Sequence, residues 1–219
     1  MHISGLWRYP VKSMGGEPLA EAELTRNGIT GDRVVHVRGK RGLLTGRTRS
    51  GLLTVPVRTG PEGVPWVDGH PWDTPAAAAT VRARAGDDAH LVAHAGPERF
   101  DVLNLLVATD GAVRRFGGDI RRLRPNILVG GVLPEAERDW PGQALAVGDV
   151  VIGIHSVRQR CIVTSIDPDS GEQDLEVSRR IRALFGNELC LNCWIIEPGI
   201  IRPDDPVTLV PTEAEPRSA

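Results

Sequence analysis

Cys161 is the residue whose chemistry is best defined by its neighbours in the sequence. It follows Arg158, Gln159 and Arg160 and opens an apolar run that ends at Ile166. Neighbouring guanidinium groups favour the thiolate, the form of cysteine that attacks electrophiles and binds soft metals. A cysteine at the start of a strand is also commonly a small buried hydrophobe. From the residues alone, both interpretations stay open.

Basic side chains recur beside glycine or proline in segments that lie far apart in the chain. Arg47 and Arg124 have such a neighbour, Arg33 lies two residues after Gly31, and Lys12 is followed by Ser13. If these segments converge, the planar guanidinium groups suit bidentate contacts to phosphate. Taken singly, each is an ordinary solvated charge. No GxGxxG, Walker A or HExxH pattern indicates a nucleotide or zinc site instead.

Cys190 and Cys193 form a CxxC motif, which in other settings indicates thiol exchange or half of a zinc site. The chain has no second CxxC, and the motif continues into the apolar residues 194–196. Packing in a core strand and a role as resolving thiol for Cys161 both remain open.

Composition limits the classes of partner. Lys and Arg (26) nearly balance Asp and Glu (28), which argues against general attraction to nucleic acid or an acidic membrane surface. The N-terminus lacks a signal pattern, and no run reaches the roughly 18 apolar residues of a membrane helix. We therefore expect a cytoplasmic protein with reduced thiols and neither a nucleic-acid nor a membrane partner.

The pattern of apolar runs and turns predicts a mostly β fold of α+β type with a few short helices. Residues 103–116 fit either a helix or a strand, and the Ala- and Gly-rich stretch 74–96 is expected to connect two β modules. Strands are expected at residues 3–9, 34–37, 52–58, 127–129, 150–154, 161–166, 193–196 and 207–210.

These segments together resemble the family that joins an N-terminal β-barrel module to a MOSC (molybdenum cofactor sulfurase C-terminal) domain. The mitochondrial amidoxime-reducing components and their bacterial relatives belong to that family. The matching motifs are Tyr9-Pro10-Val11-Lys12-Ser13, Gly31-Asp32-Arg33, Leu44-Thr45-Gly46-Arg47, Leu123-Arg124-Pro125-Asn126, Gly148-Asp149, the run from Arg160 to Gly171, and Glu197-Pro198-Gly199.

The resemblance implies a division of the chain. Residues 1–75 would form the N-terminal β-barrel module and residues 101–211 the MOSC β-barrel domain packed against it. Residues 76–100 would connect the two, or count with the first module. Residues 212–219 would be a flexible tail.

The resemblance also implies roles for individual residues. Cys161 matches the catalytic cysteine that ligates molybdenum, in a cofactor that is molybdopterin in its sulfur-free form. Pyridoxal phosphate binding is a further property that the family allows. The residues matching those around the pterin and its phosphate are Lys12, Ser13, Arg33, Arg124 and Arg160, with Arg47 and Asn126 as less close matches.

The chain departs from the family after Asp101. Relatives carry small hydroxyl side chains where this sequence has Val102 and Leu103. The backbone amides of these two residues can still serve an anion. Asp101 itself, together with Asp167, is an acidic candidate near the site, although a turn-forming role before Pro168 is the preferred interpretation of Asp167.

The resemblance implies a molybdenum-dependent oxidoreductase that reduces N-hydroxylated small molecules. The alternatives are a sulfur carrier or transferase with a persulfide on Cys161, and a carrier of the molybdenum cofactor without turnover. Because the sequence lacks an appended ferredoxin-like iron-sulfur domain, electrons are expected from a separate protein, either ferredoxin-like or a flavin reductase. The cofactor cleft is predicted between the two modules, with Cys161 near Lys12, Arg33 and Arg124.

Overall fold

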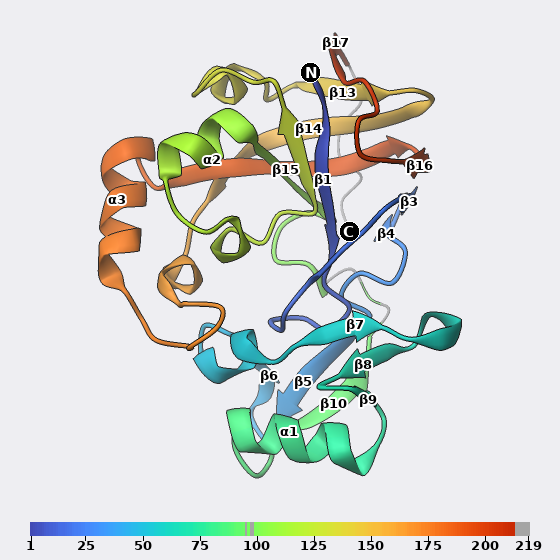
Figure 1. Ribbon diagram of the computed structural model, residues 1–219, viewed down its shortest axis with the longest axis vertical. Helices are drawn as coiled ribbons and strands as arrows, with labels where there is room; N and C mark the ends of the chain where they lie inside the picture. Colours follow the sequence, from blue (N-terminus) through green and yellow to red (C-terminus); the bar gives the residue numbers. More distant parts are fainter. Residues whose placement is uncertain (95, 97–98, 213–219) are drawn as a thin grey trace.

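An eight-stranded sheet dominates the computed structural model, which describes residues 1–94, 96 and 99–212 (Figure 1). Its strands are β1 (His2–Arg8), β2 (Glu17–Pro18), β11 (Leu105–Thr109), β12 (Ile127–Gly130), β13 (Gln143–Val147), β14 (Val150–Gln159), β15 (Glu188–Glu197) and β17 (Thr208–Pro211). Their order across the sheet is β17-β13-β14-β15-β11-β12-β1-β2. All neighbours are antiparallel except β11 and β12, which run parallel. The N-terminal strand therefore belongs to a sheet built mainly from the second half of the chain.

Both faces of this sheet are covered. On one face, α2 (Asp110–Phe116) and α3 (Leu175–Phe185) pack against the strands (Figure 1). On the other, the core includes side chains of a small sheet made of β16 (Gly199–Ile201), β3 (Ala22–Thr25) and β4 (Gly28–Ile29). Burial on both sides explains why the middle of β15 is a nearly continuous buried run and not an alternating one.

A second core forms below the large sheet in Figure 1. Val11 and Met14, which follow β1, are completely buried in it. The elements around it are β5 (Val35–Gly39), β6 (Gly42–Leu44), β7 (Val57–Thr59), β8 (Pro65–Val67), β9 (His70–Pro71), α1 (Pro75–Ala85) and β10 (His90–Ala93). The strands among them form two three-stranded sheets, in the orders β10-β5-β6 and β7-β8-β9.

The stretch 74–96 is more regular than the connecting structure expected there, since it supplies α1 and β10. Thr74 caps the helix by accepting a hydrogen bond from the amide of Ala77, and the helix ends at Gly86 with φ of 108°. Thr-Pro before an alanine-rich run and Gly after it are ordinary helix boundary signals. Ala77, Val81 and Ala85 face the second core. Residue 95 of this stretch, and residues 97 and 98 that follow it, lie outside the described residues.

The strand expected at 52–58 is wrong over its first half. Residues Ser50–Thr54 form a 3₁₀ helix, and β7 begins only at Val57. The hydroxyl of Thr54 donates to the carbonyl oxygen of Gly51 at 3.0 Å, which closes the turn. Pro56, which follows, has no N–H for a β ladder.

The structure settles the ambiguous segment 103–116 as a strand followed by a helix. β11 ends at Thr109, whose side chain caps α2 by accepting from the amide of Ala112 at 3.1 Å. Gly117 ends the helix in the left-handed conformation.

The expected mostly β fold with a few short helices is confirmed. Within the described residues, no helix has the length and apolar character needed to cross a membrane. The tail expected at 212–219 lies, from residue 213 onward, outside the described residues.

Candidate functional site

One cavity, with a volume of about 310 Å³, is lined by residues from both parts of the fold. It receives the loop after β1, the segment around β6, the loop before β12 and the end of β14. Every site residue expected from the sequence lines it, namely Lys12, Ser13, Arg33, Arg47, Arg124, Asn126, Arg160 and Cys161. Their function as ligands of a cofactor stays a prediction.

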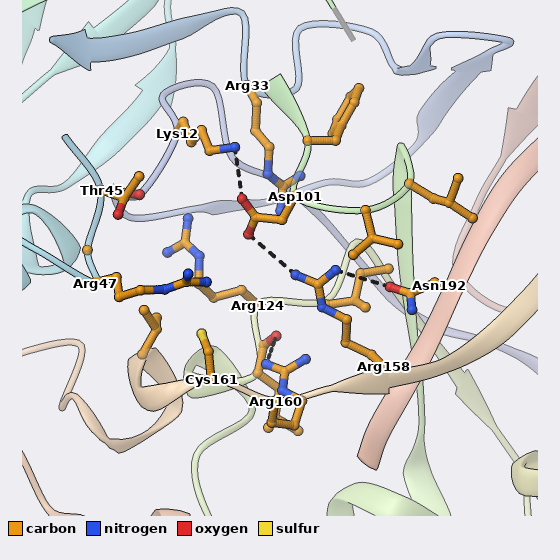
Figure 2. Close-up of a pocket in the computed structure, with 18 of the residues that line it drawn as sticks. Lys12, Arg33, Thr45, Arg47, Asp101, Arg124, Arg158, Arg160, Cys161 and Asn192 are labelled. Carbon is orange, nitrogen blue, oxygen red and sulfur yellow. Dashed lines mark hydrogen bonds and ion pairs between the residues drawn. The ribbon is translucent and has the colours of Figure 1, made fainter. Parts of the chain in front are cut away.

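The lining of this cavity is strongly cationic. Its basic residues, all labelled in Figure 2, are Lys12, Arg33, Arg47, Arg124, Arg158 and Arg160. Asp101 is the one carboxylate among the lining residues that the structure describes. Such an excess of positive charge around a small cavity suits an anionic ligand.

Cys161 lies in a turn, so the strand expected at 161–166 is wrong. β14 ends at Gln159, and Ile162–Ser165 form a 3₁₀ helix that starts directly after the cysteine. The hydroxyl of Thr164 donates to the carbonyl oxygen of Cys161 at 3.0 Å, and that of Ser165 to the carbonyl oxygen of Ile162 at 2.6 Å. These local bonds outweigh the β preference of Ile and Val. The cysteine is half-buried and faces the cavity (Figure 2).

Asn187, which no sequence pattern indicates, fixes the backbone just before Cys161. Its side-chain nitrogen Nδ2 donates to the backbone carbonyl oxygen of Arg160 at 3.0 Å. Its backbone carbonyl oxygen accepts from the backbone amide of Arg160 at 2.9 Å. It adopts a φ of 71°, in the left-handed region that Asn tolerates better than most residues. The turn carrying Cys161 is thereby tied to the start of β15.

Arg124 is a buried cation with an unused donor. Among the described residues, its Nη2 has no hydrogen-bond partner. Its guanidinium lies 4.3 Å from the centre of the Tyr9 ring. Burial lowers the pKa of Arg124 to about 10, so the group is still a cation at neutral pH. A buried donor without a partner is costly, and an anionic ligand would satisfy it.

Arg160 shows the same feature on the Cys161 side of the cavity. Its Nη2 donates to the carbonyl oxygen of Leu123 at 2.8 Å, and its buried Nε lacks a partner within the described part of the chain. The Leu123 contact links the segment carrying Arg160 and Cys161 to the loop carrying Arg124. The two guanidinium groups with unused donors are thus held by adjoining pieces of chain.

A line of polar side chains crosses the cavity (Figure 2). Lys12 Nζ lies 2.9 Å from Asp101 Oδ1, and Arg158 Nη2 lies 3.4 Å from Asp101 Oδ2. Arg158 Nη1 also donates to Asn192 Oδ1 at 3.3 Å. Burial raises the pKa of Asp101, but Lys12 and Arg158 outweigh this effect and the pKa is lowered. Asp101 is therefore ionised at neutral pH.

Asp32 organises a second, buried set of polar contacts behind Arg33. Its carboxylate pairs with the Arg33 guanidinium and accepts from the amide of Tyr9 at 2.7 Å. Asn126 Nδ2 donates to Asp32 at 3.3 Å and to the carbonyl oxygen of Trp7 at 3.3 Å. Both N–H groups of the Asn126 amide are therefore used within the protein. Asn126 thus helps to position Arg33 and the loop before β12, and its expected contact with a cofactor stays a prediction.

Three of the lining residues have left-handed backbone conformations. The φ angles are 68° for Ser13, 54° for Arg33 and 55° for Arg124. Such conformations are unfavourable for residues other than glycine and concentrate at functional sites. The amide of Arg33 donates to the carbonyl oxygen of Tyr9 at 2.8 Å, which helps to hold its turn. The chain accepts this strain where basic side chains enter the cavity.

Arg47 differs from the other basic lining residues because it is exposed. It makes no hydrogen bond or ion pair with the residues that the structure describes. Figure 2 shows its side chain extending into the cavity on the side where Cys161 lies. It is therefore an exposed charge at the cavity, available to a ligand.

The CxxC motif lies outside the cavity. Cys190 and Cys193 are both buried free thiols, in core clusters on opposite faces of the large sheet. Burial raises the pKa of the Cys190 thiol to about 11 and also raises that of Cys193. Neither thiol has the exposure or the thiolate character of a resolving cysteine. Packing is the role that the structure gives them.

The arrangement fits a small ligand that combines a phosphate with a soft metal. Unused guanidinium donors can take the phosphate, and the half-buried sulfur of Cys161 is a suitable soft ligand. No group of three His, Cys, Asp or Glu side chains is placed to hold a metal in the described ranges. A metal here would therefore depend on Cys161 together with ligands supplied by a cofactor.

Two family models match successive parts of the chain, with bounds that differ from the division expected above. Residues 85–208 match the family model of the MOSC domain, and residues 1–63 match that of the MOSC N-terminal beta barrel domain. The chain is 24% identical to the mitochondrial amidoxime-reducing component 1 of Homo sapiens, over 95% of this chain and 82% of that protein. It is 29% identical to the Mus musculus protein of the same name, over 50% of this chain and 37% of that protein.

A solved structure shows a similar fold. The YUAD protein from Bacillus subtilis aligns with 97% of this chain and 96% of its own, with a TM-score of 0.55 and 12% sequence identity.

Proposed function

Because the chain belongs to the MOSC domain family, we propose that it binds a molybdenum cofactor in the cationic cavity and reduces N-hydroxylated small molecules. The observation that carries this proposal is the pair of buried, unused guanidinium nitrogens, Arg124 Nη2 and Arg160 Nε, in the cavity that also exposes Cys161. Both residues line the same cavity, where an anionic ligand would satisfy these donors.

The residues divide into two groups by what they would hold. Cys161 would ligate the metal through its thiolate. Arg124 and Arg160, with Lys12 and Arg33, would hold the phosphate of the pterin by charge-assisted hydrogen bonds. Asp32 and Asn126 act behind them, because their contacts fix Arg33 and the loop before β12. Val102 and Leu103 line the same cavity, and their backbone amides would take the place of the hydroxyl groups that relatives have there.

When bound, the cofactor supplies the two-electron redox chemistry, which belongs to the metal and its pterin and not to the protein. In the overall reaction the N–O bond of the substrate breaks. Two electrons come from a reduced carrier and two protons from solvent, and the products are the deoxygenated nitrogen compound and water. We assign the electron supply to a separate protein of the ferredoxin-like or flavin reductase class.

The protein's own contribution is binding, orientation and control of charge. Asp101 is ionised because Lys12 and Arg158 flank it. A carboxylate at this position can accept a hydrogen bond from an N–H or O–H of the substrate. The basic side chains around it stabilise negative charge at the reacting end of the cavity.

Metal analysis of protein from a host that makes the molybdenum cofactor tests the proposal. We expect close to one molybdenum and one pterin per chain, and loss of molybdenum in Cys161→Ala. Cys193→Ala is the matched control, because it removes a buried thiol outside the cavity. The purified holoprotein, reduced chemically, should then convert benzamidoxime to benzamidine and water.

Other outcomes point to the alternative functions. Sulfane sulfur on Cys161 in protein without molybdenum would indicate a sulfur carrier or transferase. Stoichiometric cofactor without reduction of any N-hydroxylated compound would indicate a cofactor carrier. Either result would overturn the proposed reductase activity.

A further inference from the structure

Two large apolar side chains are exposed at the cavity. Leu43, on β6, is 43% exposed, and Val102, in the segment before β11, is 51% exposed. Both line the cavity that contains Cys161. They come from different parts of the fold, so their presence in the lining of one cavity is a result of tertiary structure and not of a local apolar run.

The other large exposed apolar residues of the described chain do not line this cavity. Leu133 and Ile200, for example, are 77% and 50% exposed and lie outside the cavity lining. Single exposed apolar residues of that kind are normal on protein surfaces. Apolar side chains beside a hollow lined with polar groups instead mark a place where a ligand buries apolar surface.

The size of the cavity indicates which part of a ligand would reach Leu43 and Val102. Its volume of about 310 Å³ lies at the lower end of the range of roughly 300–1,000 Å³ that small-molecule sites occupy. A cofactor held by the buried guanidinium groups would take up most of that space. The body of a substrate would then remain at the exposed edge, where Leu43 and Val102 lie.

A protein partner is a poorer fit to these two residues. A specific protein interface buries about 800 Å² on each partner, around a larger apolar centre. Two side chains from separate segments offer only a small part of that area. Their size suits an aryl ring.

We propose that Leu43 and Val102 form an apolar rest for the body of the substrate, which selects N-hydroxylated compounds that carry an aryl group. This inference rests on the proposed function, because it presumes that the reacting N–O group lies at the Cys161 end. It goes further by naming the part of the substrate that the protein recognises and the residues that recognise it.

The test compares two substrates that differ only in their body. Benzamidoxime carries a phenyl ring, whereas acetamidoxime carries a methyl group. In the double variant Leu43→Ala/Val102→Ala, we expect KM for benzamidoxime to rise about fivefold to tenfold, because apolar contact area is lost. The KM for acetamidoxime should change by less than twofold. Leu133→Ala, an exposed leucine outside the cavity, is the matched control.

A binding measurement without turnover gives a second readout. Isothermal titration of benzamidoxime into the oxidised holoprotein, with no reductant present, should show the same selective loss of affinity in the double variant. Equal effects on both substrates, or no effect, would overturn the apolar rest while leaving the reductase activity in place. Absence of molybdenum and of any turnover in the unaltered protein would overturn the proposed function and this inference with it.

Discussion

The guanidinium of Arg124 lies 4.3 Å from the centre of the Tyr9 ring, and the Tyr9 hydroxyl donates to the carbonyl oxygen of Pro125 at 3.1 Å. The ring is thus fixed by the residue that follows the arginine. Burial raises the pKa of Tyr9 to about 12 and lowers that of Arg124 to about 10. The protein therefore holds a partly desolvated cation against an aromatic face, with one N–H group left for a ligand.

Replacing Arg124 should have opposite effects on binding and on stability. We expect Arg124→Gln to reduce pterin content at least tenfold, because it removes the buried cation. In cofactor-free protein, the same change should leave the free energy of unfolding unaltered or raise it by about 1 kcal/mol, because loss of the contact with Tyr9 is offset by removal of a buried donor that has no partner in the described chain. Pterin fluorescence and urea unfolding measure the two effects. Arg124→Lys, which keeps the charge, should retain part of the pterin. A Gln variant that keeps its pterin would contradict the role assigned to Arg124.

Cys161 should be the only cysteine that reacts in the native protein. Cys161 is half-buried at the cavity, while Cys190 and Cys193 are 2% and 0% exposed. Alkylation of the native chain should therefore add one label at Cys161, and unfolding should release two further sites. Bound cofactor should protect Cys161. Peptide mass analysis after mild oxidation should find no disulfide from Cys161 to either buried cysteine, and its presence would restore the resolving-thiol hypothesis.

The sequence predicts which residues line the cavity better than it predicts the local structure that positions them. Family motifs select Lys12, Arg33, Arg124 and Cys161, but their spacing in the chain says nothing about convergence, which depends on β1 joining the sheet of the second half. The run that starts at Cys161 has β propensity, yet the structure there is a turn. The hydroxyl groups of Thr164 and Ser165 donate hydrogen bonds to nearby backbone carbonyl oxygens. The β propensity of individual residues takes no account of such bonds.

Residues that support the site from outside the family motifs have weak signals in the sequence. Asn187 and Asn192 act through one or two hydrogen bonds to distant segments, and no local pattern announces such contacts. Asp32 did have a signal, because it lies between a glycine and Arg33 within a matching motif. The helix at 75–85 also had signals, in Thr74, Pro75 and Gly86, which a composition rich in alanine and glycine concealed.

Asp101 should make the stability of the protein depend on pH in the acid range. Its pKa is lowered in the folded protein, despite burial, by Lys12 and Arg158. A carboxyl group with a lowered pKa stabilises the fold above its unfolded value of about 3.9, and this contribution is lost as pH falls through the folded pKa. The urea midpoint of Asp101→Asn should therefore lie below that of the unaltered protein at pH 7, and the gap should shrink towards pH 3. A gap that is constant with pH would show that the charge of Asp101 does not matter.

Two ion pairs connect the turn after Cys161 to the loop that precedes Arg124, and they should differ in importance. Arg122 Nη2 lies 2.7 Å from Asp167 Oδ2, with the arginine side chain only 12% exposed. Asp167 Oδ1 also accepts from the amides of Asp169 and Ser170 at 3.0 and 2.9 Å. Arg121 pairs with Asp169, whose side chain is 71% exposed, so this second pair is screened by solvent.

We therefore expect Asp167→Ala to loosen the turn that carries Cys161, while Asp169→Ala at the same turn serves as the matched control. In cofactor-free protein, Asp167→Ala should raise the alkylation rate of Cys161 several-fold, and in holoprotein it should lower molybdenum content. Asp169→Ala should change neither by more than about twofold, because exposed ion pairs contribute about 0–1 kcal/mol. Equal effects of the two variants would mean that the turn is held by its own hydroxyl and backbone bonds, and that Arg122 has no part in positioning the thiol.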